Sequence, residues 1–323
     1  MAFNPHIAAG IVLLATTILF LAAKLFRAPK RGAFCWWGWL GLALLAGLEL
    51  LLALRTPWVV TYFTPLAWTS YLLLADALVG WLRGESLLAD RPREFLSLVF
   101  WSVPLWLIFE AYNLRLENWA YVGLPGNLPL RGVGYVWSFA TIWPAIFETA
   151  DLIAALGIFA RAPDRPRTET KNSTLALLIV AGMVCVVVPV IVPQSLGRYL
   201  FGAVWLGFIL LLDPLNCRWN GFSFLSRFGE GQSREFWSFV AAGWTCGILW
   251  EFWNYWAAAK WIYIFPIGQS SKVFEMPLLG YLGFLPFALE CKVMYEFVRT
   301  VRKQLAPERR SEPWEAAHPH GSG

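Results

Sequence analysis

The sequence predicts an all-α polytopic membrane protein with about nine transmembrane helices, arranged as one N-terminal helix followed by two parallel four-helix repeats. Three observations predict this fold class. Hydrophobic residues make up 58% of the 323 residues, whereas charged residues make up only 15%. Many apolar runs have about 20 residues, the length that a helix needs to cross ~30 Å of hydrocarbon. Finally, the second half of the chain repeats an ordered pattern found in the first half.

Nine apolar runs are predicted to be membrane-spanning helices, because a backbone inside lipid has to pair its own polar groups. The shortest run, 199–212, is expected to continue through Pro214. The nine runs are residues 7–26, 34–54, 59–81, 95–112, 133–159, 174–192, 199–212, 236–256 and 276–298.

Positive charge predicts the orientation of these spans. With this layout, one side of the membrane carries 19 Lys and Arg residues, and the other side carries six. Cytoplasmic loops are enriched in Lys and Arg. We therefore expect the N-terminus outside and the C-terminus in the cytoplasm.

Residue content excludes several function classes. Only three histidines occur, all near the termini, so a haem or a histidine-ligated metal inside the bundle is excluded. The five cysteines are scattered without a Cys-x-x-Cys pair, and no glycine-rich phosphate loop is present. We therefore expect no cofactor and no metal ion. The net charge of +5 is explained by the basic residues of the loops on one side of the membrane, and no nucleic-acid partner is expected.

An internal repeat is visible as a series of matched residues in the same order. The offset between the two copies drifts only from 137 to 142, and chance does not produce so many ordered matches. The matched pairs include Trp68 and Trp205, Asp76 and Asp213, Arg93 and Arg234, Glu110 and Glu251, Asn113 and Asn254, Trp119 and Trp261, Tyr121 and Tyr263, and Glu148 and Glu290.

This repeat predicts the domain organisation. Each unit has four spans, so both units enter the membrane in the same direction and are related by a pseudo-two-fold axis along the membrane normal. Binding sites are expected where the two halves meet. The predicted divisions are 1–30 for the extra N-terminal helix, 31–162 for the first repeat, 163–173 for an inner-face linker, 174–304 for the second repeat and 305–323 for a polar cytoplasmic tail.

Glu148 and Glu290 are the first candidate catalytic residues. Each lies inside a predicted span, where a charge costs ~2.5–3.5 kcal/mol at the helix centre, and each follows a helix-bending proline, Pro144 or Pro286, by four residues. A carboxyl buried in apolar surroundings stays protonated at neutral pH, as a general acid requires. The alternative is a neutral glutamate that hydrogen-bonds across the bundle. Lys292, two residues after Glu290, is a candidate counter-charge.

Glu110 and Glu251 are the candidates for the partner base. Each is followed three residues later by an asparagine, Asn113 or Asn254, which places a carboxyl and an amide on one helix face. We expect the two asparagines to bind substrate. The alternative is that both pairs make hydrogen bonds at the end of a helix.

Aromatic residues near these acids are candidates for a substrate-binding wall, because aromatic faces stabilise a passing cation by ~0.5–2 kcal/mol. The alternative is an interfacial belt of the kind that Trp and Tyr form in membrane proteins. The candidates are Trp119, Tyr121, Trp253, Trp261 and Tyr263.

Three motifs follow one another in the second unit: Glu251-Phe252-Trp253-Asn254-Tyr255, Trp261-x-Tyr263, and an aromatic span at 286–297 that contains Pro and Glu. Their order resembles the repeated domain of integral-membrane lycopene cyclases, over about 40 residues per copy. The resemblance implies protonation of a polyene by a carboxylic acid without an obligatory metal. The chain departs from that family's Pro-x-Glu-Glu signature, since its glutamates follow the prolines by four residues. Residues 274–295 also resemble uncharacterised Trp-rich membrane proteins of bacteria.

We therefore expect a membrane enzyme that performs redox-neutral acid–base chemistry, as a cyclase, isomerase or hydratase does, on an isoprenoid- or carotenoid-like apolar substrate. Two alternatives stay open: a proton-coupled transporter or carrier of a small or lipidic solute, and a non-catalytic membrane scaffold. The expected partners are the lipid bilayer and the isoprenoid-type substrate, and the sequence leaves the oligomeric state open. The expected location is the inner (cytoplasmic) membrane of a bacterium.

Overall fold

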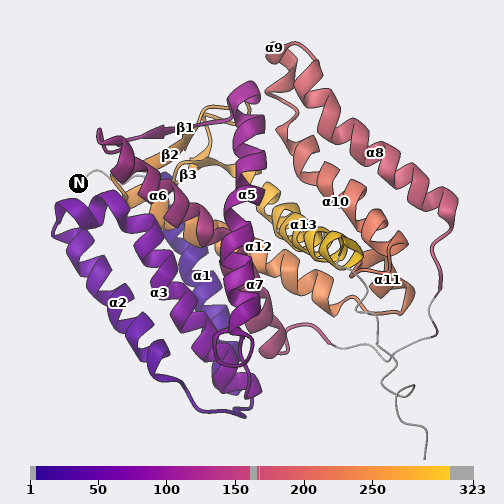
Figure 1. Cartoon of the computed structure of the whole chain (residues 1–323). Helices are drawn as coiled ribbons and strands as arrows, with labels where there is room; N and C mark the ends of the chain where they lie inside the picture. The colour runs from indigo at the N-terminus through magenta and orange to yellow at the C-terminus, as the bar shows by residue number, and fades with distance from the viewer. Residues whose placement is uncertain (1–4, 161–165, 167, 306–323) are drawn as a thin grey trace, which may run out of the picture.

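The computed structural model describes residues 5–160, 166 and 168–305, and it is mostly helical (Figure 1). The predicted linker at 163–173 lies partly outside the described residues, and the predicted tail at 305–323 lies outside them except for residue 305. The long helices are α1 (Pro5–Arg27), α2 (Trp36–Ala53), α3 (Pro57–Arg83), α5 (Pro92–Leu116), α6 (Leu128–Ala140), α7 (Ile142–Ala155), α8 (Asn172–Ile191), α10 (Phe201–Arg218), α12 (Arg234–Trp256) and α13 (Phe284–Leu305).

Short elements connect the long helices. Four strands form two small antiparallel pairs, β1 with β2 and β3 with β4. The short elements are α4 (Leu87–Asp90), β1 (Trp119–Val122), α9 (Gln194–Gly197), α11 (Phe224–Gly229), β2 (Lys260–Tyr263), β3 (Lys272–Val273), β4 (Met276–Pro277) and the 3-10 helix η1 (Leu278–Gly283).

The prediction of a mostly helical fold with long apolar helices is confirmed. Within the described part of the chain, seven helices are long and apolar enough to cross a membrane. Their exposed side chains include many large apolar residues, as expected for a surface that faces lipid. The seven are α1, α2, α3, α5, α8, α10 and the continuous η1–α13 segment.

Two of the predicted spans are interrupted rather than continuous. The span predicted at 133–159 is divided into α6 and α7 at Thr141, and the span predicted at 276–298 begins as β4 and η1 before α13 starts at Phe284. Each break comes just before a proline, Pro144 or Pro286, which has no N–H to donate to the preceding turn. Ser102 of α5 bridges the first break: its hydroxyl donates to the Phe139 carbonyl and accepts from the Trp143 N–H at 3.1 Å.

The helices form a bundle with a pair on each side and a packed centre (Figure 1). The α2–α3 pair lies on one side and the α8–α10 pair on the other, and the centre holds α5, α7, α12 and α13. The helix α12 packs against α7 and α13, while α1 packs along α12. The connections place β1 to β4 at one end of the bundle, which we call the strand end, and α4 and α11 at the opposite end.

Matched aspartates cap the short helices at the α4/α11 end. The Asp76 carboxylate accepts hydrogen bonds from the Ser86 hydroxyl at 2.9 Å and the Leu88 N–H at 2.8 Å. The Asp213 carboxylate accepts from the Ser223 hydroxyl at 3.0 Å and, through its other oxygen, from the N–H of Phe224 at 2.7 Å. Both aspartates are buried, so these bonds satisfy polar groups that would otherwise be unpaired. The same cap therefore occurs in both halves of the chain.

At the strand end, β1 and β2 join the two halves. Trp119 lies opposite Tyr263, and Tyr121 lies opposite Trp261. Gly123 follows β1 directly and has a positive φ of +67°, and a Cβ atom there would meet the Ala258 carbonyl oxygen at 2.0 Å. Glycine is thus required for this close approach. The strand pair covers the centre of the bundle at this end.

Candidate functional site

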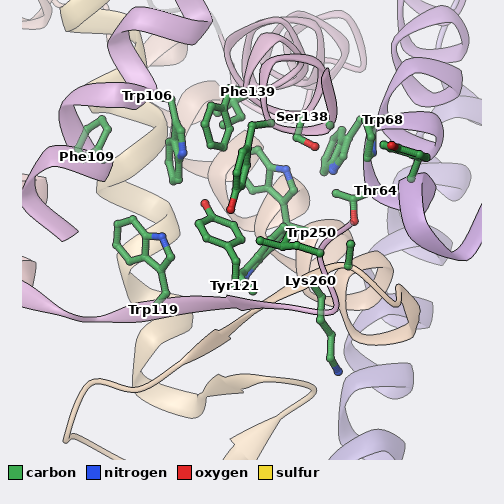
Figure 2. A pocket seen from close by; sticks show the side chains of 18 of the residues that line it. Thr64, Trp68, Trp106, Phe109, Trp119, Tyr121, Ser138, Phe139, Trp250 and Lys260 are labelled. Atoms are coloured by element: carbon green, nitrogen blue, oxygen red, sulfur yellow. The ribbon is translucent and has the colours of Figure 1, made fainter. Parts of the chain in front are cut away.

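A cavity of about 150 Å³ lies under the β1–β2 pair, between the two halves of the chain. Fourteen of its 26 lining residues are Trp, Tyr or Phe, so its wall is apolar and rich in aromatic faces. Figure 2 shows the rings of α5, α6, α12 and β1 gathered around it. The aromatic lining residues are Tyr62, Trp68, Trp106, Phe109, Trp119, Tyr121, Tyr135, Phe139, Trp205, Trp250, Trp261, Tyr263, Phe284 and Phe287.

Both halves of the chain contribute matched residues to this wall. Three of the pairs found by sequence matching line the cavity, namely Trp68 with Trp205, Trp119 with Trp261, and Tyr121 with Tyr263. The cavity therefore lies at the junction of the halves, where the parallel repeat predicted a binding site. Four of the five aromatic residues predicted to bind substrate are in its wall: Trp119, Tyr121, Trp261 and Tyr263.

The aromatic wall is held by contacts between its own rings. The centroid of Trp250 lies 5.0 Å from that of Trp68 and 6.0 Å from that of Phe287. Trp106 lies 6.0 Å from both Trp119 and Phe139. Such ring pairs pack tightly and each adds ~0.5–1.5 kcal/mol beyond area burial.

Glu110 does not line the cavity itself, but it accepts hydrogen bonds from three side chains. Its Oε1 accepts from the Tyr121 hydroxyl at 2.5 Å, the Trp106 Nε1–H at 2.8 Å and the Trp119 Nε1–H at 3.3 Å. All three donors are cavity-lining side chains. Glu110 is therefore connected to the cavity through the Tyr121 hydroxyl, and it accepts three hydrogen bonds in all.

Glu251 makes the corresponding contact with fewer donors. The Tyr263 hydroxyl donates to its Oε1 at 2.8 Å, and the Trp261 Nε1–H donates to the Tyr263 oxygen at 3.0 Å. Glu251 is fully buried, and its Oε2 has no partner among the described residues. The position that matches Trp106 is Gly247, which lies against the ring of Phe284 and has no side chain to donate. Each carboxyl thus accepts a hydrogen bond from the tyrosine of its own half, but Glu110 accepts two further hydrogen bonds that Glu251 lacks.

The two tyrosines are kept neutral by their surroundings. Burial, and after it the adjacent Glu110 carboxyl, raises the pKa of the Tyr121 hydroxyl well above its usual range. Burial and the Glu251 carboxyl do the same to the pKa of the Tyr263 hydroxyl. Both phenols therefore carry a proton at physiological pH and can pass it along their hydrogen bonds.

The asparagines predicted to bind substrate lie outside the cavity wall. The Asn113 amide donates to the Trp119 carbonyl at 2.9 Å and accepts from the Asn118 and Trp119 N–H groups. The Asn254 amide bonds the Trp261 carbonyl and N–H at 2.9 and 3.0 Å. These bonds hold β1 and β2 against the ends of α5 and α12. Both amides therefore make hydrogen bonds at the end of a helix, as the alternative interpretation predicted.

Glu148 and Glu290 are also away from the cavity wall. Both side chains are fully buried in α7 and α13, and none of their carboxyl oxygens has a partner in the part of the chain that the structure describes. Thr149, next to Glu148, bonds the Tyr71 hydroxyl at 2.7 Å. The predicted pairing of Lys292 with Glu290 is wrong: Lys292 forms ion pairs at 3.0 Å with Glu235 and Glu296.

Trp253 and Lys260 lie at the margins of the site. Trp253, predicted to bind substrate, donates from its Nε1–H to Glu49 at 3.0 Å and packs on the back of Trp68. Lys260 borders the cavity, but its side chain points away from the rings and pairs with Glu275 (Figure 2). Neither side chain offers a free polar group to a ligand.

Sequence reasoning missed several residues of the wall. Trp68 and Trp205 had a usable signal, since they are matched across the repeat. Thr64 had none that separates it from ordinary residues of an apolar span. Trp250 begins the aromatic cluster at 250–256, in which sequence reasoning did expect a ligand-binding wall.

Comparison with models of known protein families, with curated proteins and with solved structures gives no match in any of the three. The resemblance to membrane lycopene cyclases therefore stays a prediction. What this chain can do has to be inferred from the cavity and its hydrogen bonds.

Proposed function

We propose that this chain is an integral membrane enzyme that performs redox-neutral acid–base chemistry on an apolar isoprenoid-type molecule. One observation carries the proposal: two carboxyl–tyrosine pairs, Glu251 with Tyr263 and Glu110 with Tyr121, meet the same aromatic cavity. Such chemistry needs one group that gives a proton and another that takes one. Two carboxyls in unlike surroundings supply these two roles.

The unlike surroundings assign the roles. Glu251 is fully buried, has one donor and leaves one oxygen unpaired, which favours its neutral, proton-giving form. Of the two carboxyls, Glu110 has more hydrogen-bond donors to stabilise a charged form, because it accepts three hydrogen bonds. We therefore assign Glu251 as the acid and Glu110 as the base.

The proposed reaction moves one proton in and one proton out. The Tyr263 hydroxyl protonates a carbon of a double bond while Glu251 returns a proton to the Tyr263 oxygen. The cation that forms on the neighbouring carbon faces aromatic rings, which stabilise it by ~0.5–2 kcal/mol. Tyr121 then takes a proton from an adjacent carbon as it passes its own proton to Glu110. The substrate is isomerised or cyclised without an oxidant; capture of the cation by water would instead give hydration.

The membrane arrangement that we propose has nine crossings, with the strand end outside and the α4/α11 end in the cytoplasm of a bacterial cell. Two crossings are added to the seven apolar helices: α12, whose 23 residues reach ~35 Å, and the α6–α7 pair. The lower apolarity of α12 fits its position between α7 and α13. The orientation is supported by basic residues at the α4/α11 ends of the helices, among them Lys24, Arg27, Arg83, Arg218, Arg302 and Lys303.

The two four-helix repeats are supported by recurring contacts. The α2–α3 pair corresponds to α8–α10, and the capped helix α4 corresponds to α11. The helix α5 with β1 corresponds to α12 with β2, and the broken α6–α7 segment corresponds to η1–α13. In this layout α1 is the extra N-terminal helix.

The test of the proposed function is mass spectrometry of organic-soluble molecules that co-purify with the wild type and with Glu251→Gln. The expected result is a pair of isoprenoids in the wild type, equal in mass or different by one water, and only the substrate form in Glu251→Gln. Glu230→Gln is the matched control, because Glu230 pairs with Arg227 at the far end of the bundle. Bulk phospholipid alone, identical in all samples, would contradict the proposal.

A second candidate function, proton-coupled movement of a small or lipidic solute, is favoured by Glu148 and Glu290. Both carboxyls are fully buried and unpaired inside α7 and α13. Carboxyls in such positions mark proton pathways in membrane carriers. Acidification of the lumen of liposomes during solute uptake would support this candidate, provided that Glu148→Gln abolishes it.

A further inference from the structure

Two polar groups of α3 point to the kind of molecule that the cavity binds. Thr64 and Trp68 are both buried, with 6% of the surface of Thr64 and 1% of the surface of Trp68 exposed. Both residues line the cavity. Neither the Thr64 hydroxyl nor the Trp68 Nε1–H has a hydrogen-bond partner anywhere in the described chain. The Tyr121 and Tyr263 hydroxyls of the same wall, in contrast, each donate a hydrogen bond to a glutamate.

The spacing of the two groups suits a single acceptor. Thr64 and Trp68 are four residues apart, so they lie one above the other on one face of α3. Figure 2 shows both side chains on the same side of the cavity. An indole N–H only donates, and a threonine hydroxyl donates or accepts. One carbonyl or hydroxyl oxygen can accept from both, because it has two lone pairs. Buried polar groups are almost always paired in native proteins, so these two groups are suited to bind an oxygen atom inside the cavity.

The size of the cavity limits how much of a ligand enters. A cavity of about 150 Å³ is of the size that takes one benzene ring, and a long isoprenoid chain does not fit into it. Only a terminal group the size of one ring can therefore be enclosed. The rest of the molecule has to remain outside.

The wall of the cavity is partly exposed where α3 meets α6. Tyr62 of α3 and Gly134 of α6 line the cavity there, and the Tyr62 hydroxyl donates to the Leu130 carbonyl of α6 at 3.2 Å, so a chain that leaves the cavity here has to displace the Tyr62 side chain. Beside them α6 exposes large apolar side chains on its outer face. These residues, suited to contact with lipid, are Leu128, Leu130, Val133 and Val136.

We propose that the cavity encloses the ring-sized, oxygen-bearing end group of an isoprenoid, with its oxygen bound by Thr64 and Trp68 and its chain leaving between α3 and α6. This inference rests on the proposed function and specifies its substrate class. It places the reacting double bond in the end group, because the enclosed part is the part that Tyr121 and Tyr263 can reach. The substrate is thus an oxygenated isoprenoid rather than a pure hydrocarbon.

The test compares two ring-sized probes, α-terpineol and limonene, which share one ring and differ by a water added across the side-chain double bond, so that only α-terpineol carries a hydroxyl. Binding to the full chain in lipid nanodiscs is measured by calorimetry, with empty nanodiscs subtracted. The wild type is expected to bind α-terpineol about tenfold more tightly than limonene, as hydrogen bonds to buried groups allow. In Thr64→Val the ratio is expected to fall to about two, with limonene binding at least as tight as before.

Thr61→Val is the matched control. The Thr61 hydroxyl already donates to the Pro57 carbonyl at 2.8 Å, so its loss should leave the ratio unchanged. Trp68→Phe, which removes the N–H and keeps a ring, is expected to lower the ratio as Thr64→Val does. Equal affinities of the wild type for the two probes, or a ratio that Thr64→Val does not change, would overturn this inference alone. If neither probe binds and no isoprenoid co-purifies, the proposed function fails with it.

Discussion

Tyr121 lies directly opposite Trp261 in the antiparallel pair of β1 and β2. The matched residues Trp119 and Tyr263 form the reciprocal pair, with Ala120 and its partner between them. In the strand pair, the Trp of each Trp-x-Tyr motif therefore lies opposite the Tyr of the other motif. Because each tyrosine bonds a glutamate of its own half, this pairing brings a carboxyl–tyrosine pair from each half to one cavity.

Removing one phenol should stop turnover without emptying the cavity. In Tyr263→Phe, Glu251 loses its hydrogen-bond donor and its route to the cavity, and kcat is expected to fall by roughly 10²–10⁴-fold, the usual contribution of a general acid. The affinity for substrate is expected to change by less than about threefold, since the ring is kept. Steady-state kinetics in nanodiscs separate the two effects. Tyr255→Phe is the control, because Tyr255 lies outside the cavity wall, and a Tyr263→Phe enzyme with normal kcat would refute the assignment.

Deuterium incorporation from heavy water should distinguish the role of Glu251 as the acid from that of Glu110 as the base. In Glu110→Gln, protonation by Tyr263 and Glu251 remains but the product-forming proton loss is blocked, so recovered substrate is expected to contain deuterium. In Glu251→Gln, neither product nor deuterated substrate is expected, because the first proton cannot be delivered. Mass spectrometry of recovered substrate reads both outcomes. The reverse pattern would exchange the two roles, and deuterium in both variants would show that neither carboxyl is the acid.

The two unpaired carboxyls of α7 and α13 should reduce stability. Leucine fills a similar volume without a polar group, so Glu290→Leu is expected to stabilise the fold by ~1–3 kcal/mol, the cost of an unsatisfied buried group. Thermal unfolding in detergent measures this, and turnover is expected to stay within about twofold. A loss of turnover would restore the catalytic role predicted for Glu290 and Glu148. Intact turnover together with lost solute uptake would instead support the carrier.

The capping aspartates should be more important for stability than nearby surface ion pairs. Asp213→Ala removes the acceptor for a hydroxyl and two backbone N–H groups at the start of α11, and a loss of about 2 kcal/mol is expected. Asp151→Ala removes partly exposed ion pairs with Arg83 and Arg91 and is expected to cost below ~1 kcal/mol. Urea unfolding of both variants gives the comparison. Equal losses would mean that the cap adds nothing to the fold.

The proposed orientation can be read from single cysteines placed at the two ends of the bundle, in a variant whose five native cysteines are replaced. Ser270→Cys lies at the strand end and Glu85→Cys at the α4/α11 end, and both positions are exposed. A thiol reagent that does not cross membranes should label Ser270→Cys in intact cells and Glu85→Cys only after lysis. The opposite labelling would invert the topology.

The sequence by itself determined the features that depend on local composition and spacing. Long apolar runs predicted a membrane protein of helices, and matched spacings singled out Glu110, Glu251 and the Trp-x-Tyr motifs in both halves. These signals are readable because a helix must pair its own backbone in lipid and because a duplicated unit preserves its order. The proline positions also indicated where helices would bend.

The tertiary structure alone decided which side chains meet. In the fold, the Tyr121 hydroxyl donates to Glu110 and the Tyr263 hydroxyl donates to Glu251. Lys292 forms ion pairs with Glu235 and Glu296. Glu148 and Glu290 do not line the cavity. The fold also left Thr64 and Trp68 unpaired inside the cavity. Hydropathy and spacing describe one segment at a time, whereas a hydrogen bond between segments depends on how whole helices pack against each other, and packing is a property of the complete fold.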